Sequence, residues 1–236
     1  MLILSADTSG KNGSIALTQF EQESERTLAI VPLEGGTFSA QLVPQISSLL
    51  AKHNLTKNDI GGFAVASGPG SFTGLRVGLA AIKALAEILR KPIASVSLLE
   101  AIASEAAAYN PPTLTRCLAA MDARRNEVFA GEYDIGAEIP SLISESLLTL
   151  EELVQYAESW PSQEILTPDA NVLEYIRARV LHEAKLVEVA RPDASTIARL
   201  GGKKILAGRT VSPEELDASY IRRSDAEINT RRFETS

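Results

Sequence analysis

Short apolar and alternating segments at the start of the chain predict an antiparallel sheet. Residues 2–6 form an apolar run, residues 14–18 alternate between apolar and polar, and residues 27–31 are a third strand-like segment. A polar loop at residues 11–13 joins the first two segments. Because sequential strands with short connections usually pair with each other, these segments predict a β-meander.

The pattern then changes to helical spacing. A helix is predicted from Ser39, its expected N-cap, to a stop near Asn54, with a distortion of its first turns at Pro44. Its apolar positions fall on one face: Leu42, Ile46, Leu49 and Leu50.

A second long helix, residues 73–89, follows a strand at residues 63–67. Small residues recur along it, among them Gly74 and Gly78, and apolar residues surround much of it. An interior glycine costs about 1 kcal/mol relative to alanine in a helix, so close approach of another backbone is expected to offset the cost. A helix that is apolar on most sides is buried on most sides. It therefore lies either at the centre of the fold or at a subunit interface.

The rest of the chain alternates between strand and helix patterns. Asn110-Pro111-Pro112 is the clearest internal break, which predicts an N-terminal lobe at residues 1–110 and a C-terminal lobe at 111–236. The last residues could return to the first lobe. The further predicted elements are a strand at 92–96, a helix at 97–109 opened by a capping box of Ser97 and Glu100, a hairpin at 114–133 with its turn at 122–126, helices at 150–159, 169–182 and 194–200, and strand segments at 164–167, 185–189 and 219–223.

The segment Gly68–Gly78 has the densest glycine content and an unusual turn signal. Three glycines in seven residues indicate positive φ or close backbone approach, and the amides of the following helix could hold an anion. The segment contains no lysine and no Gly-Lys-Ser/Thr sequence, and the first lysine after it is Lys83, so it is not a P-loop. Thr73 stands where the dinucleotide fingerprint needs Gly or Ala. The loop is therefore not an ordinary nucleotide cradle.

Composition narrows the function classes. The 236 residues carry a net charge of −7 with a pI near 5.0, which argues against a chain that grips nucleic acid by itself. The basic pairs near the end, Arg222-Arg223 and Arg231-Arg232, are either a solvated tail or a contact to RNA or an acidic partner. The single cysteine, Cys117, lies in an apolar run and is expected in the core. With no signal peptide and no membrane span expected, we expect a cytoplasmic protein.

Residues with obvious chemistry are few. The two histidines, His53 and His182, have no metal-ligand spacing, so no metal site is expected. Asp7 ends a buried strand and precedes Thr8 and Ser9. It could orient Mg²⁺ or a water beside a phosphate, or it could close an Asx-turn through its own backbone. Asp122 is expected to be a residue of the hairpin turn.

These residues together resemble the TsaB (YeaZ-like) family, dimerisation subunits of the bacterial tRNA threonylcarbamoyladenosine biosynthesis machinery. The similarity runs through nearly the whole chain, and the glycine segment is its most specific part. The segments that carry it are Leu4–Ser9, Gly68–Gly78, Ser97–Ala101, Asp122–Arg125 with Glu127-Val128, and Tyr220–Arg223.

The resemblance implies an α/β fold with two lobes of the actin/hexokinase-like ATPase type (ASKHA), each lobe a mixed sheet that contains a β-meander and carries helices. It implies a non-catalytic subunit without catalytic residues, metal or cofactor. Such a subunit pairs with a TsaD-like catalytic subunit for threonylcarbamoyl transfer to N6 of the adenosine beside the tRNA anticodon. It also implies a TsaE-like ATPase as a partner, tRNA contact only through the complex, and a homodimer when the chain is alone.

The resemblance also suggests which residues act. Asp7, Thr8 and Ser9 would be a vestigial nucleotide site. The first two long helices of the N-terminal lobe would form the partner interface through Leu42, Ile46, Leu49, Leu50, Gly70, Phe72, Gly74, Leu75, Arg76, Gly78, Ala81 and Leu85. The chain departs from the family at Phe38-Ser39, where many relatives have His-Ser, which leaves a polar role at that helix start in doubt.

Two other functions are compatible with these residues. One is a self-sufficient ATPase or kinase-like phosphotransferase of the same fold that uses Asp7, Thr8 and Ser9 around a nucleotide. The other is a metallopeptidase, which the scarcity of histidines disfavours.

Overall fold

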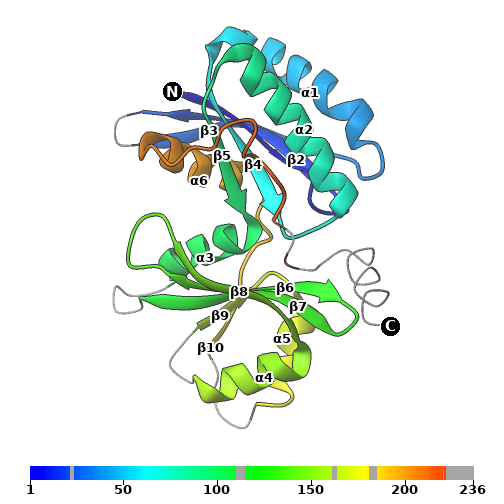
Figure 1. Cartoon of the computed structure of the whole chain (residues 1–236), viewed down its shortest axis with the longest axis vertical. Coiled ribbons are helices and arrows are strands. Elements are labelled where there is room, and N and C mark those ends of the chain that lie inside the picture. The colour runs from blue at the N-terminus through cyan, green and yellow to red at the C-terminus, as the bar shows by residue number, and fades with distance from the viewer. Residues whose placement is uncertain (22–23, 110–114, 161–163, 181–184, 220, 222–236) are drawn as a thin grey trace, which may run out of the picture.

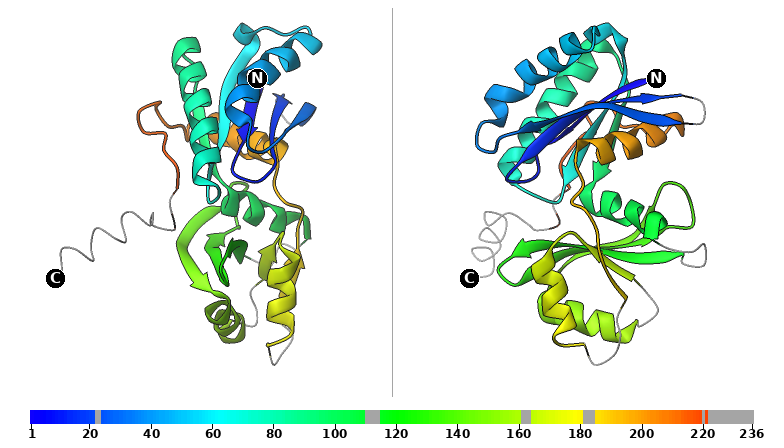
Figure 2. Two further views of the ribbon diagram at one scale, coloured as in Figure 1. Left: turned by 90° about the vertical axis from the view of Figure 1, so that its right-hand side faces the viewer. Right: turned by 180° about the vertical axis from the view of Figure 1, so that it is seen from behind.

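The computed structural model describes residues 1–21, 24–109, 115–160, 164–180, 185–219 and 221. Two five-stranded sheets are stacked along the long axis of the molecule, with helices on their faces (Figures 1 and 2). The predicted break at residues 110–112 lies outside the described residues, so the division into domains at residue 110 stays a prediction.

The first sheet has the strand order β3-β2-β1-β4-β5. Strands β1, β2 and β3 form the predicted antiparallel meander, and β4 runs parallel to both β1 and β5. The bounds are β1 Leu2–Asp7, β2 Gly13–Phe20, β3 Glu25–Leu33, β4 Ile60–Gly68 and β5 Ile93–Ser97.

The second sheet repeats this arrangement with the order β10-β9-β6-β7-β8. Its first three strands again form an antiparallel meander, and its last two continue in parallel from β6. The bounds are β6 Arg116–Arg124, β7 Glu127–Asp134, β8 Ser141–Thr149, β9 Glu164–Thr167 and β10 Lys185–Glu188. Two mixed sheets of one topology, each carrying helices, constitute the ASKHA-like fold that the resemblance implied.

Helices cover both faces of the first sheet. On one face, α1 (Phe38–Lys52) and α2 (Phe72–Leu89) pack over Leu2, Leu4 and Ala6 of β1. On the other face, α6 (Ala194–Leu206) packs in the cluster that contains Ile3. Both sets of β1 side chains are therefore buried, which is why this strand reads as a continuous apolar run.

A shared core joins the two sheets. Helix α3 (Leu98–Tyr109) lies between them, and its cluster contains Ala64 of β4 together with Cys117 and Met121 of β6. The outer face of the second sheet is covered by α4 (Leu150–Ser159) and α5 (Ala170–Arg177). The short 3-10 helix η1 (Lys57–Asp59) precedes β4.

The chain returns to the first sheet after β10. Helix α6 contacts β1, β2, β4 and β5. The following segment then runs past the ends of the parallel strands: Val211 bridges Ile93, and the Ser219 N–H donates to the Ser67 carbonyl oxygen at 2.7 Å.

Several local expectations were wrong. Helix α1 begins at Phe38 rather than after an N-cap at Ser39; Thr37 occupies the cap position and its hydroxyl donates to the Glu34 carbonyl instead. The Phe38 side chain is buried in the core cluster of the first sheet, so the first residue of the helix already packs on the sheet. The helix continues through Pro44 to Lys52.

The prediction for α6 ended too early, at residue 200. Helix α6 continues through Gly201 and Gly202 to Leu206. A Cβ at Gly201 would lie 2.3 Å from Ala64 Cβ, and one at Gly202 would lie 2.1 Å from Phe20 Cζ. These glycines therefore allow close packing on the sheet instead of ending the helix.

Candidate functional site

The corner after β1 is occupied by contacts within the chain. The Ser9 N–H donates to Asp7 Oδ1 at 2.9 Å, which closes the Asx-turn that the sequence left open. The Thr8 hydroxyl donates to the Gly74 carbonyl oxygen at 2.7 Å, and the Ser9 carbonyl accepts from the Ser71 N–H at 2.7 Å. This corner, Asp7–Ser9, is thus docked on the first turn of α2.

The glycines of the segment Gly68–Gly78 are required by this docking. A Cβ at Gly74 would lie 2.1 Å from the Thr8 carbonyl oxygen, and one at Gly78 would lie 2.4 Å from Thr8 Oγ1. A Cβ at Gly70 would lie 2.5 Å from the Ser9 carbonyl oxygen. The close approach expected for α2 is therefore real, but the approaching groups belong to the chain itself: backbone carbonyls at Gly70 and Gly74, and the Thr8 hydroxyl at Gly78.

Burial raises the pKa of the Asp7 carboxyl, and its hydrogen bonds to Ser9 act against that rise. A phosphate site needs free N–H or hydroxyl donors and a counter-cation. Here the Ser9 N–H, the Thr8 hydroxyl and the Ser71 N–H already have partners within the chain. Asp7, Thr8 and Ser9 do not fit a nucleotide phosphate in this arrangement.

The corresponding corner of the second sheet is a hairpin turn. Arg124, Arg125 and Asn126 all have positive φ. Asp122 Oδ1 accepts from the Arg124 N–H at 2.7 Å, and the Asp122 N–H donates to Asp169 Oδ2 at 2.8 Å. Asp122 therefore lies in β6, in the penultimate pair of the hairpin, opposite Val128. The turn is confined to Arg125-Asn126, which is shorter than the predicted turn at 122–126.

The residues predicted for the partner interface do not share one exposed surface. Gly70, Phe72 and Arg76 are exposed, and Ala81 and Leu85 are half-buried. The others are buried within the chain, which corrects the expectation that they face a partner directly: Leu42, Ile46, Leu49, Leu50, Gly74, Leu75 and Gly78. Apolar spacing identified the inward face of each helix, since that face packs on the sheet.

The outward face of α2 carries a different set of residues. We call the exposed residues that recur every fourth position the α2 ridge: Phe72, Arg76, Ala80, Ala84 and Ile88. The Phe72 side chain is 44% exposed and Ile88 is 73% exposed. The Arg76 guanidinium lies 3.7 Å from the Phe72 ring centroid. Helix α1 packs beside α2 and adds Val43, which is 51% exposed.

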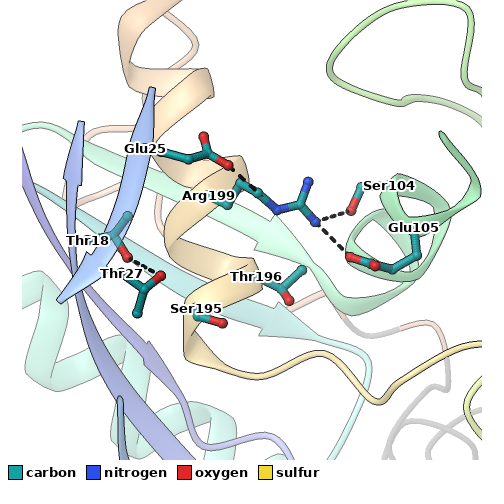
Figure 3. Close-up of a pocket in the computed structure, with 8 residues that line it drawn as sticks. All are labelled: Thr18, Glu25, Thr27, Ser104, Glu105, Ser195, Thr196 and Arg199. Carbon is teal, nitrogen blue, oxygen red and sulfur yellow. Dashed lines mark hydrogen bonds and ion pairs between the residues drawn. The ribbon is translucent and has the colours of Figure 1, made fainter. Parts of the chain in front are cut away.

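Sequence reasoning missed Arg199 of α6, which lines a polar hollow of about 590 Å³ (Figure 3). Its Nη2 lies 2.7 Å from Glu105 Oε1 and 3.2 Å from the Ser104 hydroxyl of α3. Its Nε lies 3.9 Å from Glu25 Oε1 of β3. A single arginine on a helix gives no signal in the sequence that it will pair with carboxylates of other elements. Arg199 ties α6 to α3 and to the edge of the first sheet, with carboxylates on both sides.

The remaining candidates are placed as follows. His53 is half-buried at the C-cap of α1, whereas His182, Arg222, Arg223, Arg231 and Arg232 lie outside the described residues. Cys117 is buried, and burial together with nearby Glu164 and Glu132 raises the pKa of its thiol to about 12. Among the described residues, no group of His, Cys, Asp and Glu is arranged to hold a metal ion, and no helix is long and apolar enough to cross a membrane.

Comparison with known proteins identifies the class. The family model described as TsaD, tRNA N6-adenosine threonylcarbamoyltransferase, matches residues 22–230. The chain therefore belongs to this family; the match begins after β2 and includes the rest of the first sheet and all of the second.

The most similar relatives narrow the class to the TsaB/YeaZ branch, as the sequence predicted. The chain is 28% identical to the tRNA threonylcarbamoyladenosine biosynthesis protein TsaB of Escherichia coli over 239 residues, with 96% of each chain covered. It is 27% identical to TsaB of Haemophilus influenzae, with 94% of each covered. The solved structure of YeaZ from Pseudomonas aeruginosa superposes with a TM-score of 0.71 at 26% identity, covering 93% of this chain and 99% of that one.

Proposed function

We propose that this chain acts in tRNA threonylcarbamoyladenosine biosynthesis as a non-catalytic accessory subunit that pairs with a TsaD-type catalytic subunit. The names of its relatives support the pathway. The observation that carries the pairing is the α2 ridge, an exposed and largely apolar strip beside α1.

The ridge has the form of a helix-packing surface. Residues spaced by four along a helix make the ridges that interdigitate when two helices pack. Ala80 and Ala84 in its middle would let a partner helix come close, while Phe72 and Ile88 offer large apolar contacts at its ends. Extended exposed apolar patches on soluble proteins mark interaction sites. A helix pair of a related subunit fits this surface.

The state of the Asp7–Ser9 corner supports the non-catalytic part of the proposal. The corner's polar groups fasten β1 to α2, since Thr8 bonds to Gly74 and Ser9 accepts from Ser71. The residues that could handle a nucleotide are thus used to hold the helix that carries the ridge. In this proposal the corner sets the position of the partner surface.

The α2 ridge and the net charge of the chain also bear on the three other proposed partners: tRNA, a TsaE-like ATPase and a second copy of the chain. With a net charge of −7, the chain would meet tRNA through a complex rather than alone. A TsaE-like ATPase would bind where the two subunits meet. Without its partner, the chain would pair with a second copy through the α2 ridge, because a two-fold axis can place one patch against itself.

The test is co-purification of variants with the TsaD-type subunit of the same organism. Ala84→Arg places a long cation in the middle of the ridge at an exposed position, so we expect a folded chain that no longer retains the partner. Leu206→Arg is the matched control, because Leu206 is 64% exposed at the far end of α6. Retention of the partner by Ala84→Arg would count against the proposed surface. Gly78→Leu is unsuitable, since its side chain would meet Thr8 and disturb the fold.

The non-catalytic role has its own test. Steady ATP hydrolysis by the isolated chain, abolished by Asp7→Ala, would favour the self-sufficient ATPase instead. We expect no turnover above that of a mock preparation, and the same result for the parent and for Asp7→Ala.

A further inference from the structure

A second hollow of about 600 Å³ lies between the two sheets, on the side where the chain returns to the first sheet. Its walls come from the ends of β4 and β5, from β7 and β8, and from residues 209–211 and 219. Small-molecule sites have this size, and they combine apolar walls with a few polar groups that orient the ligand. None of its residues lies on α1 or α2, so the hollow is independent of the proposed partner surface.

One wall contains a buried acceptor that no described residue of the protein uses. Glu145 of β8 is half-buried, and its Oε1 has no hydrogen-bond partner within the described part of the chain. The Ser219 hydroxyl forms a hydrogen bond with the Glu145 carboxyl group. Burial raises the pKa of that carboxyl group, and the hydrogen bond acts against the rise. A buried carboxylate oxygen without a partner is costly, so it marks a place where a ligand N–H would be stabilised.

The other charged groups of the hollow indicate the charge of that ligand. Lys204 is already paired, with its Nζ 2.7 Å from Glu100 Oε2 and 2.8 Å from the Ser95 carbonyl oxygen. Arg209 is exposed, and its guanidinium has no ion pair or hydrogen bond to any described side chain. Within the described part of the chain, the hollow thus offers one anionic acceptor and one cationic donor without partners, and the charges of its lining side chains sum to zero.

We propose that this hollow binds the zwitterion of a free amino acid. The ammonium group would donate to Glu145 Oε1, and the carboxylate would accept from the Arg209 guanidinium in the fork geometry that arginine offers. Pro140, Leu142 and Val211 line the same hollow and would contact an apolar side chain. A ligand with only one of the two charges would leave the opposite group of the hollow unpaired.

The experiment is calorimetric titration of the full chain with each of the standard L-amino acids at millimolar concentration. The amino acid that binds is then compared with its N-acetyl derivative, which lacks the ammonium, and with its amide, which lacks the carboxylate. We expect each derivative to bind at least about tenfold more weakly, because each loses one charge-assisted hydrogen bond. Absence of binding by every amino acid would show that only water fills the hollow and would overturn the proposal.

Two variants assign the contacts. Glu145→Gln keeps the shape of the side chain and removes its charge, and Arg209→Ala changes an exposed position that folding does not require. We expect both variants to bind the unmodified amino acid at least about tenfold more weakly than the parent chain does. Glu188→Gln and Arg26→Ala, at exposed strand positions outside the hollow, are the matched controls and should bind like the parent. Binding that Arg209→Ala and Glu145→Gln leave unchanged would refute this site.

Discussion

The packing of Gly78 against Thr8 predicts a strong coupling between these two residues. In Gly78→Ala, the new Cβ would lie 2.4 Å from Thr8 Oγ1, closer than side chains pack, whereas Thr8 Cβ and Cγ2 would stay at 3.6 Å. The substitution gains about 1 kcal/mol of helix propensity but costs about 1–3 kcal/mol of overpacking. Because the gain offsets part of the cost, we expect Gly78→Ala alone to lower the free energy of unfolding by up to about 2 kcal/mol.

Removal of the Thr8 hydroxyl should reverse the effect of Gly78→Ala on the free energy of unfolding, from a loss to a gain. Thr8→Ala alone should lower the free energy of unfolding by about 1–2 kcal/mol, since it removes the 2.7 Å hydrogen bond to the Gly74 carbonyl oxygen and a buried methyl group. In that background Gly78→Ala meets only ordinary contacts, so it should raise the free energy of unfolding by up to about 1 kcal/mol. The propensity gain cancels in the double-mutant cycle, so the coupling energy equals the overpacking cost, about 1–3 kcal/mol.

The assay is urea unfolding of the four chains, with slopes compared to verify two-state behaviour. Gly74→Ala is the internal control: its Cβ would meet the Thr8 carbonyl oxygen at 2.1 Å, which Thr8→Ala does not remove, so no rescue is expected. Additive effects of Thr8→Ala and Gly78→Ala would refute the intramolecular role of the glycine. A Gly78→Ala chain that is as stable as the parent but no longer binds the TsaD-type subunit would also refute this role.

Two further predictions concern the same structure. Thr149→Ala should destabilise the chain by about 1 kcal/mol in urea unfolding, because Thr149 Oγ1 accepts from the Glu152 N–H at 3.1 Å in the capping box of α4; an unchanged midpoint would contradict this. Burial raises the pKa of Asp7, so its stabilising contribution is complete below the unfolded pKa of about 3.9 and is lost as pH rises through the folded pKa. Asp7→Asn should therefore gain stability relative to the parent as the pH rises above about 4, and a pH-independent difference would show that Asp7 does not titrate in this way.

Strands and helices with strong periodicity could be predicted from sequence, and β8 could not. Strands β1 and β4 are covered on both faces and read as apolar runs, and α2 reads as a helix from its composition. Strand β8 is an edge strand whose apolar residues, such as Leu142 and Ile143, come in adjacent pairs and are exposed. Because neither face is consistently buried, no alternation marks it.

The candidate site shows the same division. Sequence located the Asp7–Ser9 corner and the helix over it, and the resemblance supplied the family. Sequence did not show that Arg199, Glu25 and Glu105 meet, since they belong to different elements and only the fold brings them together. The same holds for Glu145 and Arg209, which line one hollow from distant parts of the chain.

By itself, the sequence determined the alternation of strands and helices, the family, and the need for a close approach at Gly74 and Gly78. Hydrophobic periodicity and glycine content are local properties, so they can be read without coordinates. Only the tertiary structure decided which residue comes close. That residue is the chain's own Thr8, through its carbonyl at Gly74 and its hydroxyl at Gly78, so the surface left for a partner is the opposite face of α2, from Phe72 to Ile88.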